Sequence, residues 1–162
     1  MPSVVPGRMT AHRDQPFVVF LIGMRINQPL KIHKWMPIFA AMPRMVRELE
    51  ANPGLGFLGA HSWLGRTTIM LQYWESFEKL DSYARAKDHA HLPAWREFNR
   101  RIGTSGDVGV WHETYLVEPG SFEAIYSNMP PFGIAKFAAA VTAEGWREHA
   151  RFRLRGKDDA QN

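Results

Sequence analysis

Two histidines separated by a single residue precede a proline and a tryptophan in the stretch HAHLPAW. An imidazole titrates near neutral pH, so it can accept a substrate proton, and it can also ligate a haem iron. On a helix, His91 shares an apolar face with Trp95 and Phe98, whereas His89 points elsewhere. A helix that restarts at Pro93 would leave both histidines in a bend. Either the two histidines face a reaction pocket, with His91 as the preferred candidate, or they are buried and hydrogen-bonded structural residues.

A second set of candidates lies in the stretch VWHETY, which has the pattern of a strand. Side chains alternate along a strand, so Glu113 shares a face with Trp111 and Tyr115. This carboxylate is either a desolvated base with a raised pKa or a structural acceptor, for example of hydrogen bonds from Arg25. The residues expected to line a site for an apolar substrate are aromatic, with one methionine: Trp74, Trp95, Phe98, Trp111, Tyr115 and Met24.

The composition limits the class of protein. The chain has 162 residues, 45% of them hydrophobic and 22% charged, which is typical of one globular domain. Its net charge of +4 is modest. Many of the basic residues lie near the C-terminus, which favours a solvated tail over a nucleic-acid interface. No apolar run approaches the roughly 18 residues of a membrane span, no signal peptide is evident, and there is no cysteine. We expect a cytoplasmic protein with no metal site.

The hydrophobic pattern predicts the elements that must position these side chains. Residues 16–137 have the order strand, helix, strand, strand, helix, strand, which is the order of a ferredoxin-like α+β domain. Before this domain we expect a flexible arm over residues 1–15, and after it a helical extension with a basic tail over 138–162. Pro43 is expected to kink or restart the first helix. Ser76 is expected to cap a second helix over about residues 77–86. A short strand is expected in the stretch SFEAIY.

The first strand of this domain, in the stretch FVVFLIGMRI, is apolar on both faces. The two helices of a ferredoxin-like domain cover only one face of its sheet, so the other face needs separate cover. A second copy of the chain packed sheet to sheet would supply this cover. The pattern therefore predicts a homodimer.

Several stretches are similar to those of a known family: VVFLIGMRINQPL, GFLGAHSW, YWESFEKLDSYA, HAHLPAWREFN, VWHETY and FEAIYSNMPPFGI. In order and spacing they resemble the antibiotic-biosynthesis monooxygenase superfamily of dimeric α+β barrels. Within it they resemble the small monooxygenase family of the fumagillin-pathway polyketide monooxygenase. The resemblance covers roughly residues 17–137. Relatives commonly carry a histidine where this chain has Gln28, so a role for that histidine does not carry over.

The resemblance implies a dimeric ferredoxin-like α/β barrel and oxygen-dependent chemistry. Superfamily members include cofactor-free monooxygenases, haem-degrading enzymes, haem-dependent enzymes and proteins with no known activity. The function that we expect is that of a monooxygenase-like oxidoreductase acting on a small hydrophobic substrate, with no cofactor and with His91 as the proton acceptor. One alternative is a haem protein with His89 or His91 as the axial ligand. Another is a non-catalytic protein that binds an apolar ligand.

Overall fold

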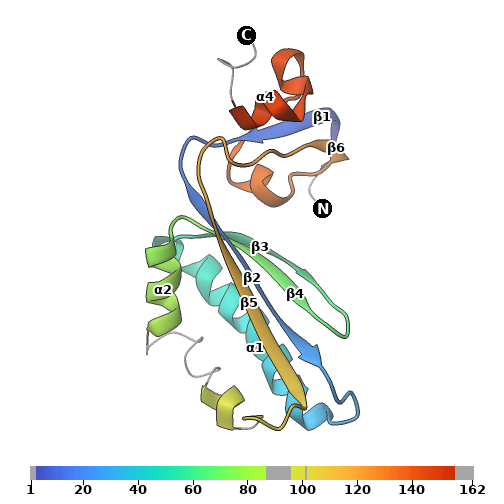
Figure 1. The fold of residues 1–162 in the computed structure, drawn as a ribbon, viewed down its shortest axis with the longest axis vertical. Helices are drawn as coiled ribbons and strands as arrows, with labels where there is room; N and C mark the ends of the chain where they lie inside the picture. Colours follow the sequence, from blue (N-terminus) through green and yellow to red (C-terminus); the bar gives the residue numbers. More distant parts are fainter. Residues whose placement is uncertain (1–2, 87–95, 101, 156–162) are drawn as a thin grey trace. The chain divides into compact units, whose positions relative to one another are not determined.

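The chain forms two compact units, each with its own sheet (Figure 1). The computed structural model describes residues 3–86, 96–100 and 102–155. We call Val18–Tyr115 the pocket unit, and Met1–Phe17 with Leu116–Asn162 the terminal unit. Among the described residues, no helix has the length and apolar character needed to cross a membrane.

The pocket unit is built on a four-stranded sheet with the strand order β3-β4-β2-β5. Its elements are β2 (Phe17–Ile26), α1 (Ile32–Ala51), η1 (Pro53–Leu55), β3 (Phe57–Trp63), β4 (Ile69–Trp74), α2 (Phe77–Arg85) and β5 (Val108–Val117), with residues 96–100 also helical. Strand β4 is antiparallel to both β2 and β3. This chain order and strand order define a ferredoxin-like α+β fold, so the predicted fold class is confirmed.

The two main helices start and continue for different reasons. Helix α2 begins where predicted, because the Ser76 side chain accepts a hydrogen bond from the Lys79 backbone N–H at 3.3 Å. Helix α1 is a single helix of 20 residues that contains both Pro37 and Pro43. Of the two expectations for Pro43, the restart was therefore wrong, and the kink stays a prediction. Packing of its apolar face overrides the local cost of a proline inside a helix.

Two clusters form the core between the helices and one face of the sheet. In the first, Trp74 is 1% exposed and packs with residues of β2, α1 and α2: Val18, Leu49, Leu80 and Tyr83. The second joins Met24 of β2 to Ile102 and Val108, with α1 side chains packed against it. Register places Val18 opposite Trp74 and Ile22 opposite Met70. The even-numbered residues of β2 therefore face the helices, and Val19 and Leu21 face the other side.

The terminal unit corrects the prediction of a flexible arm. Strand β1 (Val5–His12) lies between β6 (Tyr126–Met129) and β7 (Ala139–Thr142) and is antiparallel to both. The expected strand SFEAIY is replaced by β6, which starts at its last residue. The 138–162 segment is only partly helical: it contains β7, η3 (Gly145–Glu148) and α4 (Ala150–Arg155), after η2 (Gly133–Lys136). The pairing was missed because the partners of β1 are more than 110 residues away.

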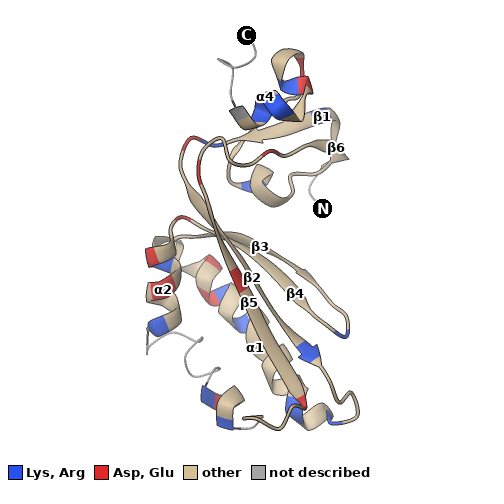
Figure 2. Ribbon diagram, viewed as in Figure 1, with Lys and Arg blue, Asp and Glu red and all other residues tan. Residues whose placement is uncertain are grey.

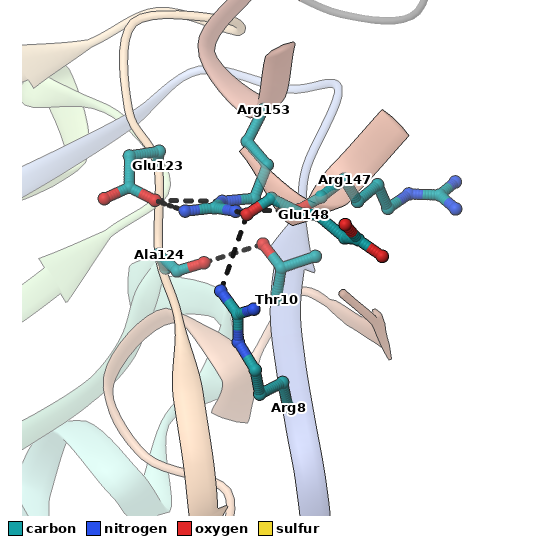
Figure 3. Close-up of polar contacts among 7 residues, drawn as sticks. All are labelled: Arg8, Thr10, Glu123, Ala124, Arg147, Glu148 and Arg153. Carbon is teal, nitrogen blue, oxygen red and sulfur yellow. Dashed lines mark hydrogen bonds and ion pairs between the residues drawn. The ribbon is translucent and has the colours of Figure 1, made fainter. Parts of the chain in front are cut away.

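An arginine fixes the C-terminal part of the terminal unit (Figure 3). The Arg153 side chain is 7% exposed, and its guanidinium donates to Glu123 Oε2 at 2.7 and 2.9 Å. It also donates to the backbone carbonyls of Arg147 and Glu148 at 2.7 and 2.9 Å. A planar guanidinium with five N–H groups can satisfy a carboxylate and two carbonyls at once. These contacts attach η3 to the segment that precedes β6.

Candidate active site

A pocket of about 410 Å³ lies within the pocket unit, between α1 and the sheet. Four residues of α1 line it, as expected for one face of a helix. Strands β2, β3, β4 and β5 and the connection between β3 and β4 contribute the rest. The lining residues are Ile38, Phe39, Met42, Pro43, Ile22, Gly23, Met24, Ser62, Trp63, Leu64, Thr68, Ile69, Met70 and Val110.

The pocket wall is apolar. Among the described residues that line it, none is ionisable and three are methionines, whose flexible thioethers adapt to ligands of different shape. The four strands of the sheet carry two charged residues, Arg25 and Glu113 (Figure 2). Ser62 and Thr68 provide the side-chain hydroxyl groups of the wall. The Thr68 hydroxyl accepts from the Met24 backbone N–H at 3.0 Å, which leaves Ser62 as the more available hydroxyl. Such a site suits an uncharged, largely apolar molecule.

Of the predicted lining residues that the structure describes, one lines this pocket. Met24 is 4% exposed and lines the pocket. Trp74 lies in the core, where its indole N–H donates to Gln72 Oε1 at 2.9 Å. Phe98 packs against the cluster of Met24, Ile102 and Val108. Phe98 therefore lies behind the wall of the pocket, and Trp74 belongs to the other core cluster.

The VWHETY candidates lie on the face of β5 opposite the pocket. Val110 lines the pocket, so Trp111, Glu113 and Tyr115 point to the other face. Glu113 is exposed in the single chain, so the expected desolvated carboxylate is not observed there. Its Oε2 accepts from the Tyr115 hydroxyl at 2.6 Å, and this hydrogen bond raises the pKa of Tyr115 above its usual value. Tyr115 therefore remains a neutral hydrogen-bond donor near neutral pH.

The expected partner of Glu113 bonds elsewhere. Arg25 donates to Thr67 Oγ1 at 2.7 Å, next to the turn between β3 and β4. The indole N–H of Trp111 is buried and has no hydrogen-bond partner among the described residues, and it lies against Gly23. Gln28, where relatives carry a histidine, uses its backbone N–H to donate to the Asp107 carbonyl at 3.1 Å.

The junction candidates His89, His91 and Trp95 lie outside the residues that the structure describes. The described lining of the pocket contains no imidazole, so it offers no axial ligand for haem. Within the described part of the chain, no three acidic, histidine or cysteine side chains gather as a metal site would require. The haem alternative therefore gains no support from the described wall.

The residues that sequence reasoning missed are mainly those of α1. The periodic apolar face of this helix includes Ile38, Phe39 and Met42, which the pattern assigns equally well to the core. The β3–β4 connection, with Leu64 72% exposed at the mouth of the pocket, carries no motif. A signal was present in Pro43, because a proline retained inside an otherwise regular helix indicates a special environment.

The fold and the pocket together define a class: an α+β, ferredoxin-like protein with an apolar cavity between helix and sheet. Residues 17–134 match the monooxygenase af470-like family, and the chain belongs to that family. The monooxygenase af470 of Aspergillus fumigatus is 27% identical over 142 residues, which cover 78% of this chain and 50% of that relative. The chain thus spans about half the length of this curated relative.

Two crystal structures of aldoxime dehydratases are similar in fold. One, a complex of OxdRE with butyraldoxime, gives a TM-score of 0.69 at 14% identity and covers 85% of this chain and 44% of that chain. The other gives 0.67 at 18% identity, over 88% of this chain and 45% of that one. At these identities the likeness concerns the fold alone. Here too, the chain matches less than half of the longer protein.

Proposed function

We propose that the pocket binds a small hydrophobic substrate and that the protein is a monooxygenase acting without a cofactor. The observation that carries the proposal is the cavity of about 410 Å³, whose described lining is mostly apolar and holds no charged side chain. Membership of the monooxygenase af470-like family supports the reaction class. An apolar cavity of this kind favours an apolar substrate and would help to keep water from a reactive intermediate.

The proposed reaction begins with loss of a proton from an acidified C–H group of the substrate. The resulting carbanion reacts with molecular oxygen, and the substrate itself supplies the electrons. A CH₂ group and O₂ then yield a carbonyl group and water, so one oxygen atom enters the product. The pocket wall contributes orientation and exclusion of water. The proton acceptor has to come from outside the described wall, because that wall contains no ionisable side chain.

We assign the role of proton acceptor to His91, with His89 as the second candidate. This assignment rests on the sequence: His91 precedes an apolar helical face that includes Phe98, where a leucine would pack without a polar partner. Phe98 packs beside Met24, a residue of the pocket wall. Glu113 remains the third candidate. A cytoplasmic location remains an expectation from the sequence.

The experiment that tests the function is an oxygen-18 incorporation assay. The purified protein is incubated under ¹⁸O₂ with the lipid-soluble small molecules of its host cells, and products are followed by mass spectrometry. We expect a product that carries one ¹⁸O atom and whose formation needs neither added metal nor haem. A labelled product that forms only together with a Soret band after addition of haem would favour the haem alternative. Ligand binding with no labelled product would indicate the non-catalytic alternative.

Replacing His91 by alanine should lower the rate of ¹⁸O incorporation by about 10²- to 10⁴-fold, the usual contribution of a general base. Binding of the substrate should change little. His89→Ala is the matched control, because it removes the same side chain two residues away, and it should have the smaller effect. Full activity of His91→Ala would contradict the assignment and direct attention to Glu113 and Tyr115.

We also propose that the protein is a homodimer in which the sheet face opposite the helices is covered by a second copy. On this face Leu21 lies opposite Leu71, and β5 adds Tyr115, which is 50% exposed in the single chain. Packing of two such faces is the usual way to cover an apolar sheet.

Light scattering of the wild-type protein at micromolar concentration should give twice the mass of the chain. Leu71→Asp should yield a monomer with an unchanged far-UV spectrum, because a carboxylate buried in a sheet–sheet interface is strongly unfavourable. Leu30→Asp is the control, because Leu30 is 96% exposed, and this variant should remain dimeric. A wild-type protein that stays monomeric on concentration would contradict the dimer.

A further inference from the structure

Helix α1 contains a broken hydrogen bond at the pocket. In a regular helix the N–H of each residue donates to the carbonyl four residues earlier. Pro43 has no N–H, so it cannot donate to the carbonyl of Phe39. The helix nevertheless continues from Ile32 to Ala51. The Phe39 carbonyl therefore lacks the helical donor four residues later, as the His33 carbonyl does before Pro37.

The position of this carbonyl relates it to the pocket. A helical carbonyl and the nitrogen four residues later lie on the same strip of the helix surface. Both ends of this strip, Phe39 and Pro43, line the pocket. Pro43 and Ser62 of β3 are both exposed, so the Pro43 end of this strip lies toward the mouth. Deeper in the wall the methionines Met24 and Met70 are 4% and 7% exposed.

We propose that the Phe39 carbonyl, left free by Pro43, accepts a hydrogen bond from the substrate and selects apolar molecules that carry a hydroxyl group. The apolar part of such a molecule lies among the methionines, and its hydroxyl group remains at the mouth. This inference rests on the proposed function, because it takes the same pocket as the substrate site. It adds the substrate class: a phenol, an enol or an alcohol on a hydrophobic body.

A carbonyl suits this task for chemical reasons. It only accepts hydrogen bonds, so it discriminates a hydroxyl from an ether of nearly the same shape. The pocket wall otherwise offers the Ser62 hydroxyl, which can both donate and accept, and the Thr68 hydroxyl, which is engaged by Met24. Because the Phe39 carbonyl can only accept, the group of the substrate that it recognises is a hydrogen-bond donor such as a hydroxyl.

The test compares two probes in three proteins. The probes are 1-naphthol and 1-methoxynaphthalene, which differ in having or lacking a hydroxyl donor. The proteins are wild type, Pro43→Ala and Pro37→Ala. Alanine restores an N–H at either position, but Pro37 is in the same helix and does not line the pocket. The ratio of the two dissociation constants is measured by calorimetry, so that general changes in the pocket cancel.

Wild type should prefer 1-naphthol by roughly two- to tenfold, the range that one net hydrogen bond provides. Pro43→Ala should lose this preference and Pro37→Ala should retain it. Both variants should unfold at a higher temperature, because a proline has left the interior of a helix. A gain in stability together with a loss of selectivity cannot arise from simple damage to the fold. Pro43→Leu restores the same N–H and should behave as Pro43→Ala does.

Other outcomes separate this inference from the proposed function. If wild type binds both probes equally, or if Pro43→Ala and Pro43→Leu retain the preference, the role of the carbonyl is overturned and the pocket assignment stands. If Pro43→Ala weakens both probes alike, the proline ring acts only as packing, and the inference fails. If neither probe binds wild type, the pocket assignment fails as well.

Discussion

Replacing Met42 by tryptophan should remove both ligand binding and turnover while leaving the fold intact. Met42 projects from α1 into the cavity and belongs to neither of the two core clusters. A larger ring there fills space that the ligand needs. We expect the affinity for 1-naphthol to fall by more than about tenfold, which corresponds to roughly 1.4 kcal/mol of binding free energy. The rate of ¹⁸O incorporation should fall in parallel.

The matched control is Met36→Trp. Met36 is on the same helix, is 43% exposed and does not line the pocket, so the identical replacement should leave binding and turnover unchanged. Far-UV circular dichroism and a thermal melt show whether each variant is folded. Normal activity in a folded Met42→Trp protein would mean that the chemistry takes place elsewhere in the chain.

Gly23→Ala should cause the largest loss of stability of any single methyl addition that the structure suggests. A Cβ at Gly23 would overlap the backbone carbonyl oxygen of Thr68 and would lie 2.7 Å from Trp111 Nε1. The first of these atoms belongs to the main chain beside β2, where Met24 and Thr68 exchange hydrogen bonds. It therefore cannot move without breaking that pairing. We expect a loss of about 3 kcal/mol or more, the upper end of the range for overpacked interiors.

Gly109→Ala is the control for Gly23→Ala. Gly109 lies in the neighbouring strand β5, and a Cβ there would meet its nearest atoms, in Arg25 and Asn27, at 3.8 and 3.9 Å. These are ordinary contacts, so this variant should stay within about 1 kcal/mol of wild type. Urea unfolding of the three proteins gives the free energies of unfolding. If Gly23→Ala changed the free energy of unfolding by no more than Gly109→Ala does, the close approach of Gly23 to the Thr68 carbonyl would be contradicted.

The pattern of the chain was sufficient for the central elements of the fold. A strand that is apolar on both faces has to lie inside a sheet, and β2 does, between β4 and β5. The side chain of Ser76 predicted the start of α2 because capping is a local interaction. The terminal unit could not be predicted in this way. Its pairing is long-range, as in the hydrogen bond from the Gly7 N–H to Asn128 Oδ1 across 121 residues.

The candidate site was predicted less well for a different reason. Met24 was found because it lies in the strand with the strongest apolar pattern, and it lines the pocket. Trp74 has the same apolar character but is 1% exposed in the core, and residue type alone does not separate core from cavity wall. The role proposed for Phe39 and Pro43 rests on their backbone atoms, which a pattern of side chains does not represent.

The most direct test of the central claim, that the pocket receives an apolar ligand, is a titration of protein labelled with ¹³C at the methionine methyl groups. Three methionines line the pocket: Met24, Met42 and Met70. Met9, Met36, Met45 and Met129 do not, and they act as internal controls. Addition of 1-naphthol should shift the three pocket signals in a saturable manner and leave these four unchanged. If the pocket signals do not respond, or if only the control signals do, the account is contradicted.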